Sequence, residues 1–132
     1  MTTDAQQKKD APAMEYLSAA EILNTDDRFY TDLSVPEWKT KDGKPGMVRL
    51  QSLTAEEVSE YVESIEGPAK RNALVLVVMR AVVDGNGRPV FNDPGQLGML
   101  KRRSMKAFMR IQEVVLQMNG LDKKAQEVAK NA

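Results

Sequence analysis

The sequence of 132 residues contains no cysteine and no histidine. Disulfides, cysteine nucleophiles, Ser-His pairs and the usual ligands of zinc sites are therefore excluded. A mechanism based on carboxylates, lysine or tyrosine would still need a cleft that a sequence does not show. We expect that this protein is not an enzyme and that it has no catalytic site, metal site or cofactor.

An excess of charge of one sign is also lacking, because 19 basic and 19 acidic residues give a formal net charge of zero. No overall field attracts nucleic acid or an anionic membrane. Aromatic residues make up only 5%, which is little for stacking on bases. The most apolar run, residues 73–79, is far shorter than the roughly 20 residues that cross a bilayer. We therefore expect neither a membrane nor a nucleic acid as a partner.

The length fits a single domain. We predict a disordered tail over residues 1–13, one domain over 14–121, and a frayed helix or tail over 122–132. The predicted fold class is mainly α with a small β-hairpin (α+β). A bundle of four or five helices would be capped by an N-terminal two-stranded hairpin.

The hairpin is predicted from alternating apolar residues on both sides of a turn-forming cluster at 41–46. Its strands should lie near residues 32–39 and 47–53. Pro36 places the first strand at a sheet edge, because proline cannot donate to a ladder. Trp38 is expected to cover the apolar side of the hairpin, with an anchor for a partner as the alternative.

Capping boxes at Ser18 and Thr54 predict two helix starts. The first helix is short, and its apolar side is too small to stand alone and should dock on something. A central, largely apolar helix is predicted from about residue 69 to 83, followed by a tight turn over 84–89. The turn fails as a calcium loop, because Arg88 and Pro89 stand where a liganding residue and a glycine belong.

The last helical region should begin with Asp93 as N-cap, restart or kink at Ser104, and stop at Asn119 and Gly120. Its buried stripe is spaced three or four residues apart. The stripe comprises Leu97, Leu100, Ser104, Phe108, Ile111, Val115 and Met118.

Beside this stripe lie Met105, Met109 and Leu116, which either fill gaps in the core or form an adaptable apolar groove. A basic face adds Lys101, Arg102, Arg103, Lys106 and Arg110. It is either solvated or contacts phosphate or an acidic protein segment. The candidate partner-binding residues are Trp38, Arg102, Met105, Lys106, Met109 and Leu116.

Four segments occur in order: 20–27, 35–38, 48–57, and 82–91 with the helix end at 116–121. Together they make residues 18–121 resemble the tail assembly chaperones of long-tailed bacteriophages and prophages. The resemblance implies a non-catalytic protein of the host cytoplasm, absent from the mature virion. It would bind the tape measure protein, keep it soluble and recruit the major tail protein. Residues 39–45 depart from the family pattern as an insert.

An apolar strip that is left open favours self-association, so we expect homo-oligomers when the client, the tape measure protein, is absent. The rival hypothesis is a small DNA-binding or regulatory helical module that uses the basic face between Lys101 and Arg110. DNA binding at low salt would favour the rival.

Overall fold

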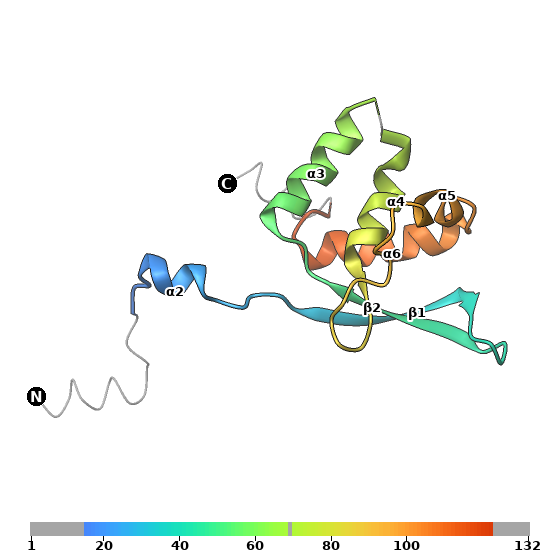
Figure 1. Ribbon diagram of the computed structural model, residues 1–132, viewed down its shortest axis with the longest axis horizontal. Coiled ribbons are helices and arrows are strands. Elements are labelled where there is room, and N and C mark those ends of the chain that lie inside the picture. Colours follow the sequence, from blue (N-terminus) through green and yellow to red (C-terminus); the bar gives the residue numbers. More distant parts are fainter. Residues whose placement is uncertain (1–14, 69, 123–132) are drawn as a thin grey trace, which may run out of the picture.

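The computed structural model describes residues 15–68 and 70–122, so the tails predicted at 1–13 and beyond 122 lie outside the described residues. The described part contains five helices and a three-stranded antiparallel sheet (Figure 1). This arrangement confirms the α+β class. The elements are α2 (Ala19–Leu23), β1 (Tyr30–Lys39), β2 (Pro45–Gln51), α3 (Ala55–Glu66), α4 (Lys70–Ala81), β3 (Val82–Val83), α5 (Gln96–Leu100) and α6 (Met105–Met118).

Strands β1 and β2 form the predicted hairpin, with Tyr30 opposite Gln51 and Val35 opposite Gly46. The strand order β1-β2-β3 leaves β1 at the edge, as Pro36 predicts. The pairing shifts register between Val35 and Lys39, where the chain enters the hairpin tip.

The third strand was not predicted, and the expectation that the central helix continues to Val83 is wrong. Helix α4 ends at Ala81, and Val82 and Val83 pair with Leu50 and Arg49 of β2. Both valines are buried. The open edge of β2 supplies backbone partners for these β-branched residues, which suit a strand better than a helix end.

A tight turn follows β3, as predicted. The carboxylate of Asp84 accepts hydrogen bonds from the backbone N–H groups of Asn86 (2.8 Å) and Arg88 (3.0 Å). These bonds, first that from Arg88, lower the pKa of Asp84. Gly87 has a φ of +80°. The turn is thus held by its own side-chain and backbone bonds.

The core lies between the sheet and the helices α4, α5 and α6 (Figure 1). Trp38 packs against it and meets Phe108 edge-to-face, with ring centroids 5.9 Å apart. The expectation that Trp38 covers the apolar side of the hairpin is confirmed. The core residues are Val35, Leu50, Val75, Val77, Val78, Ala81, Val82, Leu100, Ala107, Phe108, Ile111 and Val115.

The last helical region is divided. Helix α5 begins after Gly95, so Asp93 is not its N-cap; the Asp93 carboxylate instead accepts from the Gly95 N–H at 2.9 Å. The restart at Ser104 is confirmed, because its hydroxyl caps α6 by accepting from the Lys106 N–H. Ser104 is exposed, so its place in the buried stripe is wrong. A hydroxyl that caps a helix end stays near solvent.

Both capping boxes form. The hydroxyl of Ser18 accepts from the Glu21 N–H, that of Thr54 accepts from the Glu57 N–H, and each glutamate reaches back to its N-cap N–H. Helix α2, however, does not dock: none of its side chains is buried, and it stands away from the helical layer (Figure 1). Within the described residues α2 is therefore not docked, and the expectation that its apolar side docks on something stays a prediction.

Candidate partner-binding surface

The outward side of α6 carries a groove of about 700 Å³. Helical periodicity creates it, because Phe108, Ile111 and Val115 face the core and the intervening residues face outward. We call it the α6 groove. It is lined by Lys106, Met109, Arg110, Gln112, Glu113, Leu116, Gln117 and Asp122.

Two methionines of α6 are open to solvent. The exposed fraction is 59% for Met105 and 58% for Met109, while Leu116 is half-buried. Met105 lies one helical turn before Met109, at the end of the groove. Filling gaps in the core is thus the wrong interpretation for both methionines. They form an apolar strip that the described part of the chain leaves open.

The groove is held in place from two sides. Arg110 binds Glu37 of β1 through Nε–Oε1 (3.2 Å) and Nη2–Oε2 (2.8 Å). This contact lowers the pKa of Glu37 and raises that of Arg110. On the other side, Gln112 donates to the Tyr61 hydroxyl of α3 at 2.9 Å. Helix α6 is therefore fixed before any partner arrives.

The basic residues separate into two groups. Arg110 is paired, whereas Lys101, Arg102 and Arg103 lie in the turn between α5 and α6 rather than on a helix face. Arg102 and Lys106 are exposed and have no ion-pair partner within residues 15–68 and 70–122. The free positive charge thus gathers beside Met105.

The predicted partner-binding residues do not all come together. Lys106, Met109 and Leu116 share the α6 groove, with Met105 and Arg102 toward its N-terminal end. Trp38 does not line the groove, because it packs through Phe108 against the inward side of α6. The structure therefore offers one strip on α6 and a separate position for Trp38.

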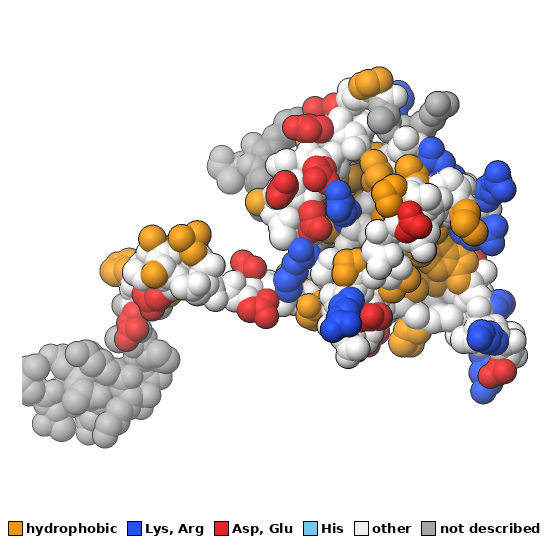
Figure 2. Space-filling view, in the orientation of Figure 1, with side chains coloured by type: hydrophobic (Ala, Val, Ile, Leu, Met, Phe, Trp, Pro, Cys, Tyr) orange, Lys and Arg blue, Asp and Glu red, His pale blue; other side chains and the backbone are white. Residues whose placement is uncertain are grey.

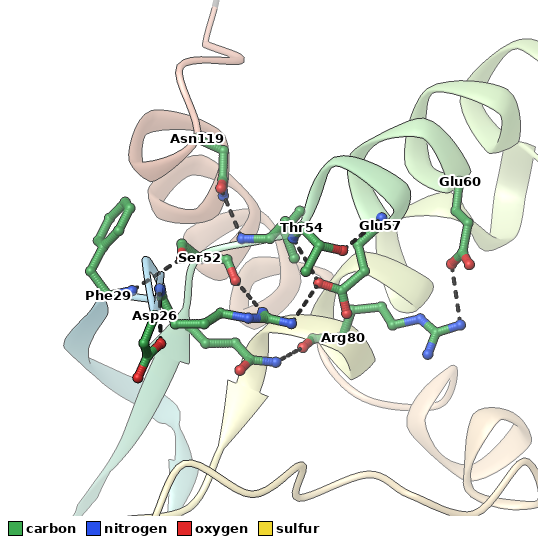
Figure 3. Close-up of polar contacts among 11 residues, drawn as sticks. Asp26, Phe29, Ser52, Thr54, Glu57, Glu60, Arg80 and Asn119 are labelled. Atoms are coloured by element: carbon green, nitrogen blue, oxygen red, sulfur yellow. Dashed lines mark hydrogen bonds and ion pairs between the residues drawn. The ribbon is translucent and has the colours of Figure 1, made fainter. Parts of the chain in front are cut away.

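A polar cluster at the start of β1 was missed by the sequence reasoning (Figure 3). Arg28 forms an ion pair with Glu57 at 3.2 Å and donates to the Ser52 carbonyl. Phe29 and Ser52 exchange two bonds, from the Ser52 N–H to the Phe29 carbonyl and from the Phe29 N–H to the Ser52 hydroxyl. Nearby, Asn119 accepts from the Leu53 N–H at 2.9 Å. The sequence signal that could have revealed this cluster is a serine between Leu50 and Leu53, because a buried hydroxyl needs hydrogen-bond partners.

A second pocket, of about 400 Å³, lies between α3 and α4. Leu53, Tyr61 and Leu76 line it together with Glu60 and Arg80, which form an ion pair at 3.1 Å. In the described ranges, no group of three or more acidic residues is arranged to hold a metal ion. Nor is any helix there long and apolar enough to cross a membrane.

Comparisons with known proteins add one similarity. No family model and no curated protein matches the chain. Among solved structures, the bacteriophage HK97 tail assembly chaperone is similar, with a TM-score of 0.49 and 15% sequence identity over 87% of this chain and 93% of that chain. This likeness does not assign the chain to a family.

Proposed function

We propose that this protein is a tail assembly chaperone of a long-tailed bacteriophage or prophage. It binds the tape measure protein, keeps it soluble in the host cytoplasm and recruits the major tail protein during tail assembly. Two independent observations support the proposal: the ordered sequence segments within residues 18–121, and the open apolar strip on α6.

The observation that carries the proposal is the exposure of Met105 and Met109 on a helix that is fixed on both sides. An exposed apolar strip with polar edges is typical of a protein-binding surface. Methionine side chains are flexible and polarizable, so they adapt to clients of varied sequence. A client helix would lay its apolar face along the α6 groove and cover Met109 and Leu116.

Co-expression with the tape measure protein encoded alongside tests this proposal. The double variant Met105→Glu with Met109→Glu places two carboxylates in the strip. Each large apolar side chain that loses its burial removes about 1.5–3 kcal/mol of binding free energy. The amount of soluble client that co-purifies should then fall by at least about tenfold. Met47→Glu is the matched control, because Met47 is 69% exposed but lies on β2.

The helix content of the double variant, measured by circular dichroism, should equal that of the wild type because both positions are exposed. A double variant that still co-purifies with the client at wild-type level would contradict client binding at the α6 groove. The client complex should also persist when salt is raised, because the contact is apolar.

The rival function, DNA binding, is favoured by the free charge of Arg102 and Lys106. A gel shift at low salt separates the two. Submicromolar DNA binding that is lost in Arg102→Glu with Lys106→Glu would support the rival. A wild-type protein that binds no DNA in this range and co-purifies with the tape measure protein supports the chaperone function.

A further inference from the structure

The N-terminal arm, residues 15–27, exposes apolar side chains that nothing in the described part of the chain covers. The exposed fraction is 98% for Tyr16 and 82% for Leu23, and Leu17 and Ile22 are also exposed. Figure 2 shows hydrophobic side chains exposed on the segment that stands apart from the body. An isolated helix of five residues is marginal in water even with its capping box, so a surface that α2 can cover would add to its stability.

The arm is also acidic. It carries Glu15, Glu21, Asp26 and Asp27 and no basic residue. Its combination of apolar and acidic side chains is the complement of the N-terminal end of α6. There, Met105 and Met109 stand beside Arg102 and Lys106, and the charge of Lys106 also acts on Glu37. The C-terminal part of the α6 groove includes Glu113 and Asp122 and suits an acidic segment less.

The arm points away from this surface in its own chain. Its root is fixed where Arg28 binds Glu57, beside Met118 and Asn119 at the C-terminal end of α6. In Figure 1 the arm leaves the body on the side opposite to α5, the helix that precedes the N-terminal end of α6.

We propose that the arm of one copy docks on the N-terminal part of the α6 groove of a second copy. Leu17, Ile22 and Leu23 cover Met105 and Met109, and the arm's acids face Arg102 and Lys106. In a twofold dimer each copy gives one arm and receives one. The client, if it binds the same groove, would displace the arm, and this step rests on the proposed function. The docking of the arm itself needs only two copies of this chain.

The absence of native cysteine allows a direct test by disulfide cross-linking. Leu23→Cys and Met109→Cys are prepared as separate full-length variants, one with a size tag, then mixed and oxidised. A disulfide forms only where the two Cα atoms approach to about 4.4–6.8 Å. The control pair is Leu23→Cys with Glu63→Cys, because Glu63 lies on α3. The yield of mixed dimer with Met109→Cys should exceed the yield with Glu63→Cys by at least about tenfold.

Three outcomes would overturn the proposal. The first is equal yields from the Met109 and Glu63 partners. The second is a chain carrying both cysteines that closes within itself at high dilution, because the arm would then dock in its own chain. The third is Leu23→Cys alone that cross-links as efficiently as the mixed pair, because the contact would then be between arms.

Charge reversal tests specificity without removing apolar contacts. Arg102→Glu with Lys106→Glu in the Met109→Cys chain should reduce the cross-link. Asp26→Lys with Asp27→Lys in the Leu23→Cys chain should restore it. All four positions are exposed, so the fold should persist, as circular dichroism would show. If the reversed arm gives no recovery, the charge pairing is wrong.

Adding the tape measure protein to the mixture before oxidation separates this inference from the proposed function. Loss of the cross-link supports both. A cross-link that persists while the client co-purifies supports docking of the arm and overturns client binding at the same groove.

Discussion

At the scale of single residues, Gly87 meets two constraints at once. Its φ of +80° is strained for other residues, and a Cβ there would lie 3.0 Å from the Tyr30 hydroxyl. Gly87→Val should therefore lower the free energy of unfolding by at least ~1 kcal/mol. Gly98→Ala is the contrasting control, because Gly98 lies in α5 with open space around it and should gain about 0.5–1 kcal/mol. Urea unfolding measures both, and equal stabilities would show that the turn tolerates the side chain.

Glu37 links the fold to pH. Its hydrogen bonds to Arg110 lower its pKa from the ordinary 4.5. Below pH 4.5 the Glu37 carboxylate binds a proton more readily in the unfolded chain than in the folded chain. The free energy of unfolding therefore rises with pH in this range. The stabilisation is complete above 4.5 and is lost as pH falls through the lowered pKa. Because both side chains are partly exposed, the effect should be small and weaker at high salt.

We therefore expect Glu37→Gln to reduce the dependence of unfolding free energy on pH as the pH falls below the ordinary pKa of 4.5. Asp42→Asn at the hairpin tip is the control, because it removes a carboxylate that lies outside any ion pair of the described residues. Denaturant titrations at several pH values give the slope. A slope equal to that of the wild type would show that the Glu37–Arg110 pair is not maintained in solution.

At the scale of elements, the sequence predicted starts and stops better than the path between them. Ser18, Thr54, Ser104 and Gly120 carry local chemistry, which acts within one turn of the chain. Strand β3 was missed because its partner, β2, is distant in sequence, and an apolar run suits a helix and a strand equally. The basic cluster at 101–103 was placed on a helix because charge patterns do not reveal a turn.

The candidate surface was predicted only in part, because local patterns in the sequence show which residues face outward but not which distant residues they contact. Periodicity separates Met109 from the core-facing Phe108 and Ile111, so the outward strip followed from spacing alone. The pairing of Arg110 with Glu37 joins residues of α6 and β1, and no local pattern shows it. Trp38 was grouped with the methionines because a sequence does not tell which side of α6 it meets.

Helix α4 offers a test of burial along one element. Val77 is buried, with an exposed fraction of 2%, whereas the neighbouring Leu76 is half-buried, and both line the pocket between α3 and α4. Val77→Asp should lower the free energy of unfolding by several kcal/mol, on the order of a small domain's whole stability. Leu76→Asp should cost less, because its carboxylate can reach water. Thermal melts compare the two, and a Val77→Asp melting temperature near the wild type would show that α4 is not central.

At the scale of the whole molecule, one core joins the sheet to α4, α5 and α6. We expect these elements to unfold together in a single two-state transition. The calorimetry should use the arm variant Leu17→Asp with Leu23→Asp, which the proposed docking of the arm predicts to be monomeric. Its calorimetric enthalpy of unfolding should equal its van't Hoff enthalpy. Two resolved transitions would show that the hairpin and the helices are separate folding units.

Trp38 gives the chain an optical probe of its own. It is the only tryptophan, and its indole lies against Phe108 on the inward side of α6. Indole emission moves to shorter wavelength in apolar surroundings and to longer wavelength in water. Unfolding should therefore shift the emission to the red, while a ligand on the outward strip of α6 should leave its wavelength nearly constant. A single unlabelled fluorescence titration can thus distinguish occupation of the surface from opening of the hairpin.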